Sequence, residues 1–429
     1  MTGSPLGNVA RTTSHRVVIP FYVYGAAALL VATVMLLVSH RSFTGHYFQP
    51  HLLAITHTMA LGWATMIILG AGHQLFPVLV ETDLYSEGLA RASFLLAAVG
   101  IPLLVYGFHS FDLGLPARLG GTLVLGAVLA FMANIGMGLV RSKRENVHAV
   151  FVFTSTAWLL LTAALGLALL FNFTRSLLPH DSVHYLGLHA HLGIVGWFLL
   201  LVLGVGSRLV PMFLISKYTA PRLLWAVFIL VNTALLGHTV FFLVDMPAWS
   251  DYVPVTMVAA ALLLFAHYCR QAYRQRIRRK VDAQMRVTLL AVALMLLPTA
   301  VLLVLLTSIA LGGGAQVRVA LLYGFTIFFG WLTAIILGMT FKTLPFIVWN
   351  KVYRPRATLG RMPGPKDLFS DRLFLATVAA YLAGFTLFGW GIAQASVVLL
   401  KIGAVALLAT ALLYNWSIGR MVFIKQLGP

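Results

Sequence analysis

The sequence predicts an all-α polytopic membrane protein, with about twelve transmembrane helices in three parallel four-helix repeats of pseudo-threefold symmetry. Of its 429 residues, 60% are hydrophobic and only 10% are charged. Apolar runs of about 20 residues, the length that crosses a bilayer core, recur from end to end. Because no stretch is long and polar enough for a soluble domain, we expect a single membrane domain over residues 1–429.

The apolar runs place the twelve spans along the chain. They lie at about 17–40, 51–73, 93–110, 117–140, 148–172, 184–206, 222–244, 252–271, 286–310, 317–340, 373–391 and 395–419. With the N-terminus on the cytoplasmic side, 25 of the 30 Lys and Arg fall on that side. The five on the outer side are Arg41, Arg118, Arg175, Arg318 and Lys401. This asymmetry follows the positive-inside rule, so we expect both termini in the cytoplasm and the chain in a bacterial inner membrane.

The charged residues and the cysteine exclude several classes of function. The net charge of +19 comes from cytoplasmic loops such as 270–280, so the expected partner is the lipid bilayer and not nucleic acid. All 11 carboxylates lie in loops or at helix ends, which leaves no carboxylate relay through the bilayer. The single cysteine, Cys269, excludes an internal disulfide, a Cys-ligated cluster and covalent c-type haem attachment. A bound metal must therefore be held by histidine.

An internal repeat of 134 residues predicts how the spans are arranged. The motif Gly-Trp-x6-Gly-x6-Pro occurs three times, at Gly62-Trp63, Gly70 and Pro77, at Gly196-Trp197, Gly204 and Pro211, and at Gly330-Trp331, Gly338 and Pro345. The copies fall on spans 2, 6 and 10 and define repeats at about 17–140, 148–271 and 286–419. Four helices per repeat make the copies parallel. Glycine lets helices approach closely, and we expect each proline to end its helix at the inner surface.

Histidines are the candidate ligands for a cofactor. His57, His189 and His191 lie within the predicted bilayer, His51 lies at the outer mouth of span 2, and His238 lies near the outer end of span 7. Imidazole is costly to bury unless its ring nitrogens are satisfied. It is also the usual nitrogen ligand of haem iron and copper. These five are therefore the predicted metal ligands, and ordinary buried, hydrogen-bonded histidines are the alternative.

The repeat relates the histidines to one another. His57 and His191 occupy equivalent positions in the first two repeats, and Phe325 occupies that position in the third. One histidine from each of two neighbouring helices at equal depth is the geometry of a bis-histidine haem. His189 precedes His191 by two residues, so their rings point roughly 200° apart and one helix can serve two different spaces.

At these residues the sequence resembles subunit I of the haem-copper oxidase superfamily, the oxygen reductases and nitric oxide reductases. The run H-A-H-L-G-I-V-G-W at 189–197, continued by Gly204 and Pro211, resembles the H-x-H-x-G-x-x-G-W…G…P pattern on helix 10 of the C-type oxidases. His57 is the counterpart of that family's haem histidine on helix 2. The resemblance implies twelve helices in three arcs of four, b-type haem, copper, and cytochrome c or quinol as electron donor, with partner subunits.

The sequence also departs from that family. Its H-x-H lies on span 6, whereas span 10 contains RVALLYGFTIFFGW and no histidine. Span 7 carries only His238, and no tyrosine is a clear equivalent of the family's active-site tyrosine. The resemblance therefore implies a divergent member, similar to the NnrS-like branch, and not a standard proton-pumping oxidase. On this basis we expect His57 and His191 to bind one haem, and His189, with His238 and His51, to hold copper or a second haem.

Three functions follow from these expectations. The first is a haem and copper protein for redox chemistry or for handling nitric oxide or oxygen, which leaves open whether the chain is an oxidoreductase. The second is a copper or haem transport or assembly factor. The third is a scaffold subunit of a respiratory complex that carries no cofactor.

Overall fold

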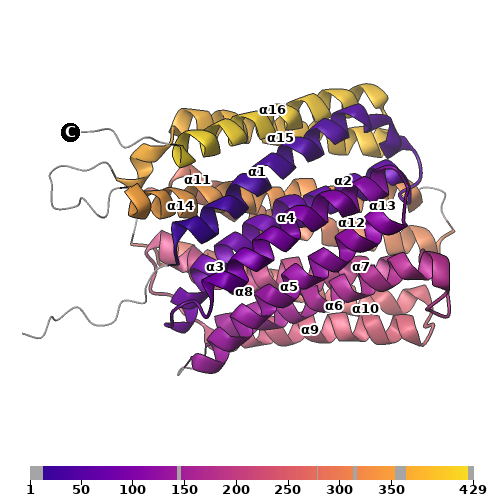
Figure 1. Cartoon of the computed structure of the whole chain (residues 1–429), viewed down its shortest axis with the longest axis horizontal. Coiled ribbons are helices and arrows are strands. Elements are labelled where there is room, and N and C mark those ends of the chain that lie inside the picture. The colour runs from indigo at the N-terminus through magenta and orange to yellow at the C-terminus, as the bar shows by residue number, and fades with distance from the viewer. Residues whose placement is uncertain (1–12, 143–145, 278, 313–315, 353–363, 424–429) are drawn as a thin grey trace, which may run out of the picture.

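The computed structural model confirms the fold class. It describes residues 13–142, 146–277, 279–312, 316–352 and 364–423, which form helices and no β-strand. By length and composition, twelve helices within these residues could cross a membrane. They run side by side as one bundle (Figure 1).

The twelve spans are formed by the following helices. The first four are α1 (His15–Val38); α2, η2 and α3 (Pro50–His57, Thr58–Thr65 and Met66–Val80); α4 (Glu87–His109); and α5 (Leu115–Arg141). The next four are α6 (Val147–Arg175); α7, η3 and α8 (Leu186–His191, Leu192–Leu199 and Leu200–Leu214); α9 (Pro221–Leu243); and α10 (Tyr252–Arg274). The last four are α11 and α12 (Ala283–Leu294 and Leu296–Ala310); α13, η5 and α14 (Gln316–Phe325, Thr326–Leu332 and Thr333–Val352); α15 (Asp371–Gln394); and α16 (Val397–Val422).

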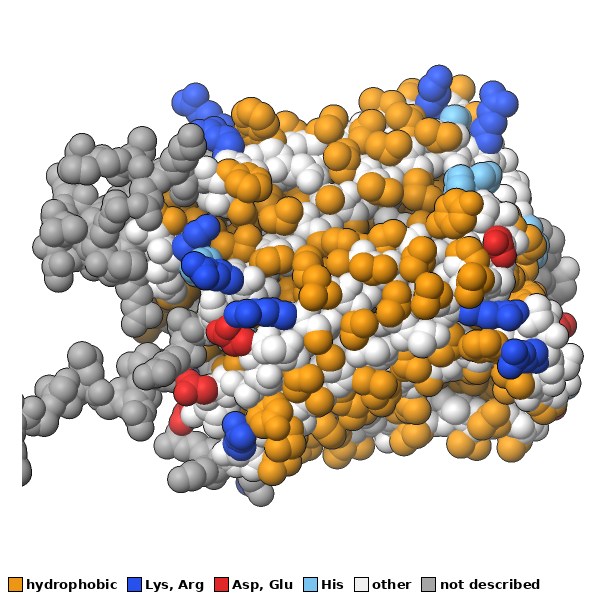
Figure 2. Space-filling model, in the orientation of Figure 1, with side chains coloured by type: hydrophobic (Ala, Val, Ile, Leu, Met, Phe, Trp, Pro, Cys, Tyr) orange, Lys and Arg blue, Asp and Glu red, His pale blue; other side chains and the backbone are white. Residues whose placement is uncertain are grey.

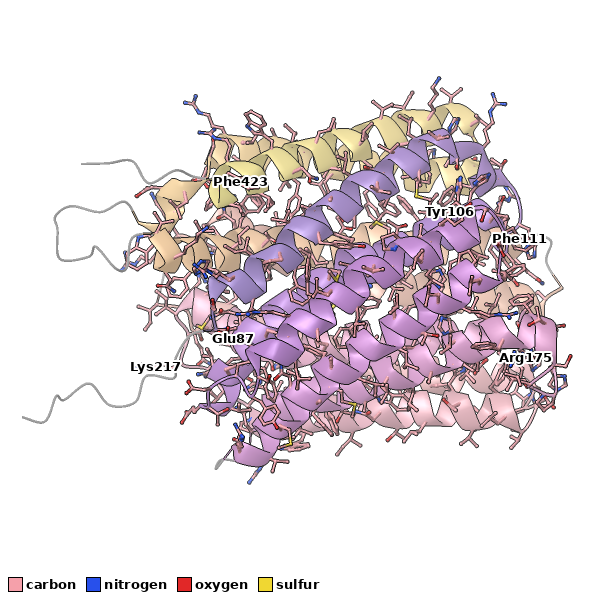
Figure 3. All side chains as sticks on the ribbon, viewed as in Figure 1. Glu87, Tyr106, Phe111, Arg175, Lys217 and Phe423 are labelled. Atoms are coloured by element: carbon pink, nitrogen blue, oxygen red, sulfur yellow. The ribbon has the colours of Figure 1, made fainter. Side chains whose placement is uncertain are left out.

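The two ends of the bundle match the alternation of loops expected for a membrane protein. Glu87, Lys217 and Phe423 lie at one end, and Phe111 and Arg175 lie at the other (Figure 3). Hydrophobic side chains cover the middle of the face in Figure 2, and the Lys and Arg side chains on it lie towards the ends. This is the surface that a bilayer requires. The predicted cytoplasmic tails, 1–12 and 424–429, lie outside the described residues.

The helix contacts form a closed ring. The first helix of each four packs on the second, so α1 contacts η2 and α3, α6 contacts η3 and α8, and α11 contacts α14. The third and fourth pack together as α4 with α5, α9 with α10, and α15 with α16. Between groups, α5 packs on α6, α10 on α12, and α16 on α1. These contacts agree with the predicted repeat, which stays a prediction.

Spans 2, 6 and 10 each contain a π-helical segment, and these three segments lie at matching positions of the predicted repeat. They begin at Thr58, Leu192 and Thr326, which are separated by 134 residues. A π-helical turn holds more residues than an α-helical turn and changes the angular direction of the side chains around it. Because η2 and η3 begin directly after His57 and His191, they help set where these rings point.

The prolines of the repeated motif do not end their helices, so that prediction was wrong. Pro77, Pro211 and Pro345 lie inside α3, α8 and α14. A proline frees the carbonyl four residues earlier. Side chains bind two of these carbonyls, because Thr13 Oγ1 donates to His73 O at 2.7 Å and the Tyr268 hydroxyl donates to Ser207 O at 2.9 Å. Span 2 therefore continues to residue 80 and span 10 to residue 352, beyond the predicted ends at 73 and 340.

Two tryptophans of the repeated motif link neighbouring groups of helices. The indole Nε1 of Trp63 donates to Thr333 Oγ1 at 3.3 Å, and Nε1 of Trp197 donates to Thr65 Oγ1 at 3.1 Å. Thr65 lies two residues after Trp63, and Thr333 lies two residues after Trp331. Around the closed ring, where the first repeat comes after the third, both Trp63 and Trp197 therefore donate to the repeat before their own. These hydrogen bonds join spans 2, 6 and 10 at the centre of the ring.

Candidate functional site

Two cavities lie on opposite sides of span 6. The His57 cavity has a volume of about 200 Å³, and His57 and His189 line it with residues from α4, α5 and α6. The His191 cavity has a volume of about 310 Å³, and His191 and His238 line it with residues from α10, α12 and η5. His189 and His191 therefore line different cavities, as their spacing along the helix predicts.

His57 and His191 are held in the same way. His57 Nδ1 lies 2.8 Å from Leu53 O, and His191 Nδ1 lies 2.8 Å from Gly187 O. Because a carbonyl oxygen only accepts, each Nδ1 carries the hydrogen and each Nε2 keeps its lone pair. A backbone carbonyl is one of the common partners of the second ring nitrogen in a metal-binding histidine, since it fixes the tautomer and the ring orientation.

The rings of His57 and His189 face each other in the His57 cavity. Their centroids are 6.5 Å apart and their planes differ by 19°. Two imidazoles that bind one metal from opposite sides, each at about 2 Å, have centroids roughly 6 Å apart. His189 Nδ1 is buried and has no hydrogen-bond partner among the described residues. A Cβ added at Gly166 would lie 2.8 Å from His189 Cε1, so glycine leaves room for this ring. The separation of the two rings is therefore close to that of two imidazoles on one metal.

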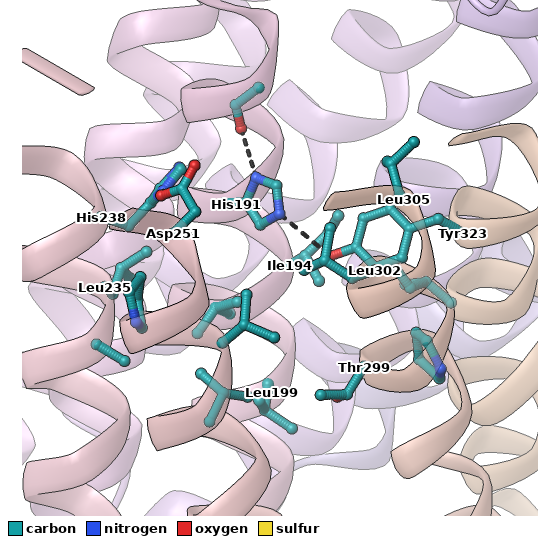
Figure 4. Close-up of a pocket in the computed structure, with 18 of the residues that line it drawn as sticks. His191, Ile194, Leu199, Leu235, His238, Asp251, Thr299, Leu302, Leu305 and Tyr323 are labelled. Atoms are coloured by element: carbon teal, nitrogen blue, oxygen red, sulfur yellow. Dashed lines mark hydrogen bonds and ion pairs between the residues drawn. The ribbon is translucent and has the colours of Figure 1, made fainter. Parts of the chain in front are cut away.

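The His191 cavity has a polar end, on the side of the bundle that the sequence predicts to be the outer one (Figure 4). The Tyr323 hydroxyl lies 3.2 Å from His191 Nε2 and donates to it, since Nδ1 carries the ring hydrogen. His238 Nδ1 lies 2.8 Å from Asp251 Oδ1. The carboxylate holds the ring so that Nε2 keeps a lone pair, and that atom is buried with no partner in the described chain. The ring centroids of His191 and His238 are 5.0 Å apart.

The histidines are grouped differently from the sequence prediction. His57 faces His189 and not His191, whereas His191 lies beside His238. Residues at equivalent positions of a rotational repeat point into successive cavities around the ring, so His57 and His191 line different cavities. His51 lies beside His109, with centroids 5.0 Å apart, and lines neither cavity.

The predicted copper set is not assembled. His189, His238 and His51 lie in three different places, and no three His, Cys, Asp or Glu side chains in the described parts of the chain are placed to hold a metal ion. The roles of all five histidines as ligands stay predictions.

Sequence reasoning missed Tyr323 and Asp251. Tyr323 lies 134 residues after His189. It therefore occupies the position in the third repeat that is equivalent to His189 in the second. Asp251 had no comparable signal. It is one of the carboxylates at helix ends and directly precedes α10.

The corresponding space between the third and first groups is filled by aromatic rings. Phe325, at the position equivalent to His57 and His191, stacks on Phe388 and Phe385 with centroids 4.9 and 5.6 Å apart. Phe43 packs on Phe388 at 4.9 Å. Histidines therefore line the two cavities beside span 6, whereas phenylalanines fill the space between the third and first groups of helices.

Fold and site together define a class, that of polytopic helical membrane proteins with paired histidines in internal cavities. No protein-family model and no curated protein matches the chain. Its resemblance to the haem-copper oxidases thus stays a prediction, which rests on the predicted repeat and on the histidine and Gly-Trp motifs.

Proposed function

We propose that this chain is an integral membrane protein that binds a b-type haem between His57 and His189 and serves redox chemistry or the handling of nitric oxide or oxygen. The observation that carries the proposal is the pair of facing imidazoles, 6.5 Å apart and nearly parallel. A non-covalent haem suits a chain whose single cysteine, Cys269, is buried. When bound between two histidines, the haem would supply one-electron transfer.

The residues of the chain then have distinct tasks. The Leu53 carbonyl holds the His57 ring, and apolar walls of the His57 cavity exclude water. In the His191 cavity, Asp251 orients His238 so that its Nε2 can accept a proton. This cavity is the candidate place for a gas or a copper ion. Cytochrome c, quinol or a partner subunit would supply electrons.

The test of the proposal is the cofactor content of the purified protein. Protein from haem-replete cells is expected to be red, to contain b-type haem in a pyridine haemochrome assay, and to have a six-coordinate low-spin spectrum. Elemental analysis measures iron and copper in the same sample. Colourless protein without iron would refute the proposal.

A change behind the His189 ring should weaken haem binding without removing a ligand. In Gly166→Ala the new Cβ would lie 2.8 Å from His189 Cε1 and must displace the ring. Overpacking of this kind costs about 1–3 kcal/mol, which predicts haem affinity about 5- to 150-fold weaker in a titration of apoprotein. Gly187→Ala is the matched control, since its Cβ meets no atom within 4 Å. Equal affinity in the two variants would contradict this role for Gly166.

The orientation is part of the proposal. We infer a bacterial inner membrane, with residues 1 and 429 on the cytoplasmic side, from the distribution of Lys and Arg. A green fluorescent protein fused after residue 429 should fluoresce, and alkaline phosphatase at that position should be inactive. The opposite result would reverse the orientation.

Copper transport is the second candidate function, and paired histidines outside the two cavities favour it. His51 lies beside His109, and His180 lies beside His184, with centroids 5.0 and 4.4 Å apart. A transporter would hold labile, substoichiometric copper. Its spectrum would not change with nitric oxide, carbon monoxide or dithionite.

A further inference from the structure

The hydrogen bonds between tryptophan and threonine at the ring centre form a pattern with one member missing. Trp63 donates to Thr333 and Trp197 donates to Thr65, in each case two residues beyond the tryptophan of the preceding repeat. The same rule pairs Trp331 with residue 199. That residue is Leu199, whose side chain cannot accept a hydrogen bond.

The missing bond lies at the His191 cavity. Trp331 and Leu199 both line this cavity. Trp331 is only 2% exposed, and its indole N–H makes no hydrogen bond to any described residue, unlike those of Trp63 and Trp197. The completely buried side-chain nitrogens without a partner in the described chain do not include Trp331 Nε1, so this atom keeps some accessible surface. A donor retained in a cavity wall is therefore available to a molecule that enters the cavity.

We propose that the indole N–H of Trp331 is a ligand-binding donor, which orients an apolar molecule carrying a carbonyl or similar acceptor oxygen in the His191 cavity. Trp331 lies eight residues beyond Tyr323 on span 10, about two helical turns away. It is thus well separated from the polar end formed by His191, His238 and Tyr323. The walls between are mainly Leu, Val and Ile, which suits a lipid-soluble quinone. This inference does not depend on haem binding.

The test compares the binding of two small molecules of similar shape. Duroquinone carries two carbonyl oxygens, and durene is the hydrocarbon without them. Binding of each to the purified protein is measured by equilibrium dialysis and corrected for partition into protein-free detergent micelles. One neutral hydrogen bond predicts that wild-type protein prefers duroquinone about 2- to 10-fold.

Three variants test whether the Trp331 N–H causes the preference for duroquinone. Trp331→Phe removes the donor and should abolish the preference while durene still binds. Leu199→Thr supplies the missing acceptor, so the indole N–H turns to it and the preference should also disappear. Leu199→Val has the shape of the threonine variant without its hydroxyl, and it should keep the preference.

Other outcomes overturn the proposal. A preference that survives in Trp331→Phe would place the carbonyl on another donor, such as Tyr323. Loss of the preference in Leu199→Val would show that cavity shape, and not the N–H, decides it. Equal binding of the two probes to the wild-type protein would exclude an acceptor ligand at Trp331. Because none of these measurements needs haem, a colourless protein would refute the proposed function and leave this test intact.

Discussion

Replacing either His57 or His189 with alanine should abolish tight haem binding, whereas His191→Ala and His238→Ala should leave the haem spectrum in place. The imidazoles of His57 and His189 face each other at 6.5 Å, and the other two line a different cavity. Changes to groups that merely orient a ligand cost 10- to 100-fold in metal affinity. Loss of a ligand itself is expected to weaken binding more than about 100-fold, measured by haem-to-protein ratio and visible absorption.

A rescue experiment separates a ligand from a structural histidine. The alanine at position 57 or 189 leaves space for free imidazole, which should restore the low-spin spectrum when it is added to the haem-loaded variant. His191→Ala is the matched control from the same helix. If haem is lost in His57→Ala and His191→Ala but retained in His189→Ala, the pairing expected from sequence is correct and the facing rings of His57 and His189 are not the ligands.

The second large effect is expected where α4 crosses α5. In Gly120→Ala the new Cβ would lie 2.4 Å from Leu104 N and 2.7 Å from Gly100 O. Both are backbone atoms and cannot rotate away, so the two helices must separate. Overpacking predicts a loss of about 2–3 kcal/mol in the free energy of unfolding, and close contact through small residues is what holds such helices together in lipid. Thermal unfolding in detergent measures it.

Gly126→Ala, on the same helix, is the control. Its Cβ would lie 3.4 Å from Leu96 Cδ1, the end of a flexible side chain. Alanine is the better helix former, by about 1 kcal/mol in water, so this variant should be as stable as the wild type or slightly more stable. Equal destabilisation by the two substitutions would show that α4 and α5 do not meet at Gly120. Neither glycine lines the two histidine cavities, and unfolding can be measured on protein without cofactor.

The repeat register predicts more of the site than the equivalence of two histidines. It identified the equivalence of His57 and His191, and the structure holds both through Nδ1 by a carbonyl four residues earlier. Applied to His189, the same register leads to Tyr323, which donates to His191 Nε2. Asp251 could not be found this way, because its importance comes from the contact with His238 across two spans.

The sequence by itself determined the membrane class, the twelve spans and the residues with unusual chemistry. These depend on hydropathy and spacing, which are local properties of the chain. Only the tertiary structure decided that His57 faces His189 and that His191 lies beside His238. The direction of a ring depends on how each helix is rotated against its neighbours. Here π-helical segments that begin at Thr58 and Leu192 alter the angular spacing that a regular helix would impose.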